Sequence, residues 1–207
     1  MNALKKAGLV LALVLVGILA KAQTIVEPSV TEEDLLVESW WIKPLDQKYK
    51  WAFFNLTEAK YNYDSEQTSF LNYSVVGYNL YKGIGPAVGT RFLANEASAL
   101  AGVQYYFQNP KVLIYTIFTS DIKSDPILEL YTLWQYRPEI NDKLKFFSQL
   151  STTTNYRNGD HEFGFQRVRA GLDWGLFQAG LALNMTQIGS DWDNDVAPGI
   201  FVRLEFQ

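Results

Sequence analysis

Long stretches of alternating or aromatic-rich apolar residues, separated by short polar turns, fill the chain from about residue 48 onward. The last stretch, residues 200–207 (IFVRLEFQ), shows the pattern most clearly. Successive side chains of a β-strand point to opposite faces, so Arg203 and Glu205 share one face. The other face is wholly apolar and carries Ile200, Val202, Leu204 and Phe206. Long strands of this kind, joined by tight turns, are typical of a membrane-spanning barrel.

The same pattern predicts ten strands, and turn-forming residues such as Asn109-Pro110 and Asn158-Gly159 stand between them. The expected strands are 49–61, 68–82, 84–94, 97–108, 111–122, 127–138, 144–156, 161–174, 177–188 and 197–206. An alternating segment at Leu35–Lys43 and a short strand at 24–30 would form an N-terminal hairpin. We therefore expect an all-β fold, an antiparallel up-and-down transmembrane β-barrel of 10–12 strands with short turns.

The first 22 residues have the features of a secretory signal peptide. Lys5 and Lys6 precede an uncharged apolar run, and Ala20-Lys21-Ala22 fits a cleavage site before Gln23. A membrane-anchoring helix is the alternative, but the run is shorter than the roughly 20 residues that a spanning helix needs. We divide the chain into a signal peptide (1–22), a polar N-terminal segment (23–34) and one barrel domain (35–207).

Composition narrows the class of protein further. Aromatic residues make up 15% of the chain and its mean hydropathy is −0.08, whereas a helical membrane protein would be far more apolar. A soluble β-sandwich could share this balance, although its strands would be shorter. Removing residues 1–22 takes away three lysines, so the net charge falls from −4 to −7 (−4 − 3), which argues against a nucleic-acid partner. The absence of cysteine excludes disulfides, thiolate metal sites and a lipidated cysteine.

The turns fall into two sets if both ends of the barrel chain lie in the periplasm. The outward set would be 62–67, 95–96, 123–126, 157–160 and 189–196, and the periplasmic set 82–83, 109–110, 141–143 and 175–176. The outward set is the longer and the more acidic, and bacterial barrels have their longer loops outside.

The signal peptide, the even strand meander and the apolar alternation into a C-terminal aromatic residue resemble small bacterial outer-membrane β-barrel proteins. The resemblance covers nearly the whole chain after residue 22, and it is architectural. It implies a bacterial outer-membrane location and membrane lipid as a partner. In that group the closing strand usually ends on the aromatic residue itself, whereas here Gln207 follows Phe206. No motif indicates a subfamily.

Polar residues on the faces opposite the apolar ones are candidates to line the lumen. They are Arg91, Glu129, Arg137, Arg167, Arg169, Asp173, Asn184, Arg203 and Glu205. The five arginines exceed the three carboxylates by two, and arginine rings favour anions in pores. The pattern supports a passive channel for small polar or anionic solutes. The alternative is a closed structural barrel, or a subunit of an envelope complex, in which these residues form ion pairs.

Other chemistry has weaker support in the sequence. His161, the one histidine, follows Asp160 in an expected outer turn and gives a third hypothesis, a hydrolase at the barrel rim. The acidic run of Asp191, Asp193 and Asp195 resembles the start of a calcium loop but lacks the glycine and distal glutamate. The glycines of residues 83–89 do not have dinucleotide-binding spacing, and we expect no cofactor.

Overall fold

The alternating segments form antiparallel strands in the computed structural model, which describes residues 24–48, 50–93, 96–191 and 193–206. Residues 1–22, the expected signal peptide, therefore lie outside the described residues. The strands are β1 (Thr24–Thr31), β2 (Asp34–Pro44), β3 (Trp51–Asn62), β4 (Thr68–Tyr78), β5 (Ile84–Leu93), β6 (Glu96–Gln108), β7 (Val112–Asp121), β8 (Ile127–Tyr136), β9 (Glu139–Asn141), β10 (Leu144–Arg157), β11 (Asp160–Asp173), β12 (Phe177–Ile188) and β13 (Asp193–Phe206).

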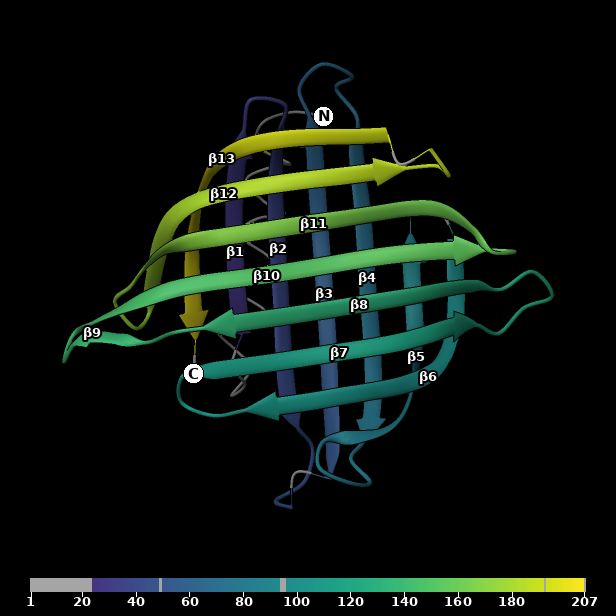
Figure 1. Cartoon of the computed structure of the whole chain (residues 1–207), viewed down its shortest axis with the longest axis horizontal. Coiled ribbons are helices and arrows are strands. Elements are labelled where there is room, and N and C mark those ends of the chain that lie inside the picture. Colours follow the sequence, from purple (N-terminus) through teal and green to yellow (C-terminus); the bar gives the residue numbers. More distant parts are fainter. Residues whose placement is uncertain (1–23, 49, 94–95, 192, 207) are drawn as a thin grey trace.

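The sheet closes on itself because β1 pairs with β13, with Thr24 opposite Phe206. The short β9 pairs only with β10, so the closed wall consists of the other twelve strands. Figure 1 shows β6 to β12 crossing in front of β1 to β5, as the strand tilt of a barrel requires. The predicted barrel is confirmed at twelve strands, since the N-terminal hairpin supplies the strand that closes it. Among the described residues, no helix is long and apolar enough to cross a bilayer.

The barrel has an inner end, defined here as the end that holds Thr24 and Phe206, and an opposite outer end. The expected alternation of turns between the ends is present, but the expected difference in length is wrong. Turns 45–50 and 79–83 at the inner end are as long as turns 63–67 and 122–126 at the outer end. The reason is that two strands end at other residues than predicted. β13 pairs with β12 from Asp193 onward instead of beginning at residue 197, and β4 ends at Tyr78 instead of residue 82.

Charge still distinguishes the two ends of the barrel. The outer turns carry one lysine, Lys123, and six acidic residues: Glu32, Glu33, Asp64, Glu66, Asp125 and Asp191. The inner turns carry two acidic residues, Asp46 and Asp142, and six basic ones: Lys48, Lys50, Lys82, Lys111, Arg137 and Lys143. Two of the tightest turns have positive φ at both central residues. They are Lys82-Gly83 at the inner end and Asn158-Gly159 at the outer end. That geometry suits the right-handed twist of a hairpin, which explains why the Asn-Gly pair predicted its turn correctly.

The outward face of the wall is largely apolar. Trp134, Tyr136, Trp174 and Phe177 are exposed on it, as the alternation predicts. Near the inner end the Trp174 and Phe177 rings lie 5.8 Å apart between centroids, and aromatic rings at strand ends suit the membrane interface.

Polar side chains interrupt the apolar outward face on β2, β3 and β4. Trp41 Nε1 donates to Asn55 Oδ1 at 2.7 Å, and Asn55 Nδ2 donates to Ser74 Oγ at 2.8 Å. Asn72 Nδ2 donates in turn to Thr57 Oγ1 at 2.8 Å. These bonds satisfy the polar groups within the wall, which lowers the cost of placing them in an apolar setting.

The inward face forms a packed core in the half of the barrel toward the inner end. Its centre is Phe54, whose ring centroid lies 4.4 Å from that of Tyr115 and 5.5 Å from that of Tyr131. Buried aliphatic side chains surround these rings, including Ile42 and Leu133. Side chains from β2, β3, β7 and β8 thus fill this part of the interior.

Candidate functional site inside the barrel

Three glutamates stand side by side on the inward faces of β1, β2 and β3. In the strand register Glu27 lies opposite Glu38, and Glu38 lies opposite Glu58. Adjacent like charges on one sheet face destabilise it unless counter-charges approach. All three are buried, so this row is stable only if positively charged side chains lie close to it inside the barrel.

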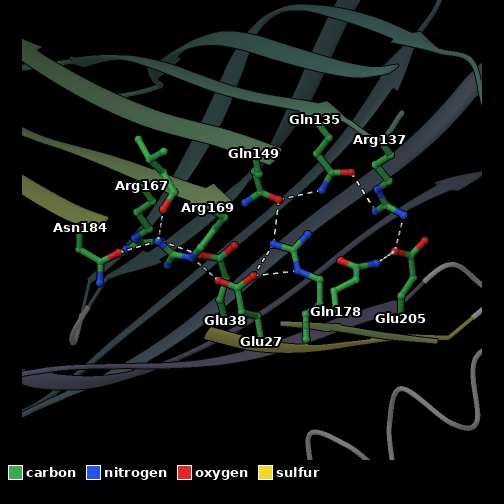
Figure 2. A network of polar contacts seen from close by, with 12 residues as sticks. Glu27, Glu38, Gln135, Arg137, Gln149, Arg167, Arg169, Gln178, Asn184 and Glu205 are labelled. Atoms are coloured by element: carbon green, nitrogen blue, oxygen red, sulfur yellow. Dashed lines mark hydrogen bonds and ion pairs between the residues drawn. The ribbon is translucent and has the colours of Figure 1, made fainter. Parts of the chain in front are cut away.

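Arginines of β11 and β13 pair with these glutamates (Figure 2): β11 approaches across the interior, whereas β13 is the paired neighbour of β1. Arg167 donates to Glu38 at 2.7 Å through Nη1 and to Glu58 at 2.8 Å through Nη2. Glu27 accepts from Arg169 Nε at 2.7 Å and from Arg203 Nε at 2.8 Å. Charge-assisted hydrogen bonds of this kind are among the strongest polar contacts in proteins. Here they join β11 to β1, β2 and β3, and they join β13 to its neighbour β1.

Amides extend the network toward the inner end. Arg203 Nη2 donates to Gln149 Oε1 at 2.8 Å, and Gln135 Nε2 donates to the same oxygen at 2.7 Å. Arg137 then donates to Gln135 at 3.0 Å and pairs with Glu205 at 2.7 Å. Figure 2 shows these side chains as one continuous chain of contacts.

A second ionic cluster lies on the other side of the interior, toward the outer end. Arg91 pairs with Asp121 at 2.8 Å and with Glu129 at 2.7 Å. Lys123 reaches Asp121 from the outer turn at 2.8 Å. Tyr73 and Thr119 share a 2.9 Å hydrogen bond nearby, which gives the cluster a polar neighbour on β4.

The structure places all of the sequence-predicted lumen residues on the inward face and brings them into these clusters. Arg91 and Glu129 belong to the second cluster, and the remainder belong to the first or contact it, Asn184 through Arg169 at 2.9 Å and Asp173 near Arg137 at 3.7 Å. The expected surplus of positive charge is wrong, because eight carboxylates are buried inside with the five arginines. These carboxylates are Glu27, Asp34, Glu38, Glu58, Asp121, Glu129, Asp173 and Glu205.

The acidic row is absent from the sequence-predicted lumen residues. Glu27 lies in the segment 23–34, Glu38 in the N-terminal hairpin and Glu58 in the predicted strand 49–61. A signal was nevertheless present. Glu38 alternates in phase with Leu36 and Trp40, and Glu58 alternates with Leu56. A lone carboxylate on an otherwise apolar face indicates an inward position with a counter-charge from elsewhere in the fold.

The network leaves little space at mid-barrel. Arg169 is 1% exposed and Arg203 is 0% exposed, whereas arginines that line an open pore would be wet. Large side chains beside them, among them Trp40, Phe147 and Phe201, are equally enclosed. The interior is therefore filled by apolar packing and ion pairs at this depth.

A cavity of about 390 Å³ opens at the outer end, between the β2–β4 wall and the β11–β12 wall. Arg167 and Glu58 of the first network form part of its lining, and so do Asp34 and Lys60, which pair at 2.7 Å. The cavity is therefore continuous with the ionic network beneath it.

His161, the residue of the rim-hydrolase hypothesis, lies at the outer end of β11. His161 is buried, its Nδ1 lies 2.9 Å from the Gly189 carbonyl oxygen, and its ring packs on Tyr156. Asp160 precedes it on the same strand and points to the opposite face.

The acidic run at residues 191–195 lies partly within a strand. Asp193 and Asp195 belong to β13 and pair with β12, which leaves Asp191 in a short turn. Within the described part of the chain, no group of three or more acidic or histidine side chains has the arrangement of a metal site. Instead, a hydrogen bond with Asp195 raises the pKa of the Glu33 carboxyl.

Comparisons with known proteins give a fold and no family. No family model matches the chain, and no curated protein has a similar sequence. LpxR from Salmonella typhimurium has a similar structure, with a TM-score of 0.51, 6% identity, and coverage of 89% of this chain and 100% of that chain. A chain from work on in-meso crystallisation of membrane proteins has a TM-score of 0.50 and 12% identity, over 89% of this chain and 84% of its own.

At these identities the likeness shows the fold alone. Together with the closed twelve-stranded wall, it shows that the chain has the architecture of bacterial outer-membrane β-barrels. The activity of such a barrel depends on its interior and its rims.

Proposed function

We propose that the protein is an outer-membrane β-barrel with a closed interior, which acts as a structural element or as a subunit of an envelope complex. The observation that carries the proposal is the ionic network across mid-barrel, in which the fully enclosed Arg203 joins Glu27 to Gln149. Passage of a solute would require these buried pairs to separate, which is costly because each charge would lose its partner.

Planar-bilayer recording tests the closed interior. We expect the refolded protein to show no discrete conductance steps, because ion pairs and aromatic side chains fill the section around Arg203. Heat-modifiable migration would show that the barrel is folded, and a known porin in the same bilayers would show that the assay detects pores. Steady steps from the folded protein would contradict the proposal.

The second candidate function is passage of small polar or anionic solutes. Two observations favour it: the outer cavity, and several buried polar atoms in the network that have no hydrogen-bond partner among the described residues. These atoms include Glu38 Oε1, Tyr131 Oη, Arg169 Nη2 and Arg203 Nη1. If this function holds, recordings in a salt gradient will show a reversal potential, and the combined Arg167→Gln and Arg169→Gln changes will shift it.

Location is a separate part of the proposal. The outward apolar face suits a bilayer, and the first 22 residues have the composition of a secretory signal. We expect the protein from cells to begin at Gln23 and to fractionate with the outer membrane. N-terminal sequencing and membrane separation check this, and a retained Met1 or recovery from the soluble periplasm would refute it.

A further inference from the structure

The outer cavity lies where β2, β3 and β4 face β11 and β12, at the end of the barrel that carries the acidic turns. Its volume of about 390 Å³ is within the range of small-molecule sites, roughly 300–1,000 Å³. Because the ionic network closes its floor, a molecule could enter and leave only through the outer end. The cavity therefore has the form of a binding site.

The charged groups of the lining are already compensated by one another. Arg167 is held by Glu58 and Glu38, and Lys60 pairs with Asp34, whose carboxylate also accepts from Thr31 Oγ1 at 3.1 Å. An anionic ligand would have to compete with buried carboxylates for these cations, and a cationic ligand would face the reverse competition. The site therefore disfavours a ligand with net charge.

Neutral hydrogen-bonding groups make up much of the remaining lining. Among the described residues, the side chains of Gln67, Ser69 and Thr186 make no hydrogen bond, so their amide and hydroxyl groups are available to a ligand. Each of these groups both donates and accepts. A ligand with several hydroxyl groups has the same dual character.

Two phenylalanines of β11 supply an apolar surface in the same cavity. Phe163 is 38% exposed, and its ring centroid lies 6.4 Å from that of Phe165. The Phe165 ring is already in contact with a cation, because the Arg167 guanidinium lies 4.0 Å from its centroid. Phe163 thus offers the free ring face on which an apolar ligand surface can stack.

We infer that the outer cavity binds a small neutral, hydroxyl-rich ligand, such as a monosaccharide or disaccharide. The C–H face of a sugar ring would stack on Phe163, while its hydroxyl groups would bond to Gln67, Ser69 and Thr186. The carboxylates of the ion pairs beneath could accept from its hydroxyl groups through lone pairs that the cations do not use. This inference goes beyond the proposed function, because binding at one end requires no passage through the barrel.

Saturation-transfer NMR and equilibrium dialysis on the folded protein in detergent provide the test. Glucose and maltose are the neutral probes, and glucose 6-phosphate and glucosamine are the charged counterparts. We expect saturable binding of a neutral probe, with both charged counterparts weaker. Absence of saturable binding by glucose and maltose, or a preference for a charged counterpart, would overturn the inference.

A pair of matched variants locates the site. Phe163→Ala should weaken binding of the neutral probe about tenfold, the equivalent of one aromatic contact. Phe118→Ala removes a similarly exposed ring from the outward face of β7 and should leave affinity unchanged. Equal affinity in the two variants would place binding elsewhere and refute the assignment. Binding and conductance are measured in separate experiments. A negative binding result would therefore refute this inference without testing the closed-barrel proposal, which only the bilayer recordings test.

Discussion

Replacing Glu27 with glutamine should lower the free energy of unfolding by about 3–5 kcal/mol. The Glu27 carboxylate is the common partner of Arg169 and Arg203, and all three side chains are at most 1% exposed. Glutamine keeps the shape of the side chain but removes its negative charge. The two buried guanidinium groups would then lack this counter-charge. Urea unfolding in detergent micelles, followed by tryptophan fluorescence, measures the loss.

A matched control is available on the surface. Glu139→Gln changes an exposed glutamate at the start of β9, and its effect should stay within about 0.5 kcal/mol. Converting Glu27, Arg169 and Arg203 together to leucine or methionine should recover much of the loss, because an apolar replacement of a buried ionic group is often neutral. If Glu27→Gln unfolds at the same urea concentration as the unmodified protein, the network is solvated and the closed interior is wrong.

Phe54→Ala should destabilise the barrel by about 3–5 kcal/mol. The Phe54 ring is 2% exposed and packs between Tyr115 and Tyr131, so its removal leaves a cavity in the largest apolar cluster of the interior. The same unfolding assay measures the effect. Phe118→Ala, on the outward face, is the control: that ring is 48% exposed, and its loss should cost clearly less.

Both predictions distinguish a filled interior from a wet one. In a water-filled lumen the Glu27 charge would be screened and Phe54 would be partly hydrated, so each change would have a small effect. Equal costs for Phe54→Ala and Phe118→Ala would show that the inward face is no better packed than the outward one. Such a result would support the channel, the second candidate function.

The strands were largely predictable because membrane barrels impose a period of two on every strand. The inward position of Arg167, Arg169 and Arg203 followed from alternation with apolar neighbours, and the turn at Asn158-Gly159 followed from its residues. Strand ends were less predictable. The run from Asp193 to Asp195 has turn-like composition but pairs with β12, because a continuing ladder satisfies its backbone groups.

Whether a segment forms a strand of the wall, and whether its side chains point inward or outward, are thus local properties. The order of residues along the chain was sufficient to infer them. Contacts across the interior depend on how the sheet closes. Arg203 and Glu27 are 176 positions apart and meet only because β1 pairs with β13, while Arg167 reaches Glu58 from the opposite wall. Alternation shows that a side chain points inward but does not identify what it faces there. The stagger and closure of the barrel determine those partners, and with them whether the inward charges line a pore or neutralise one another.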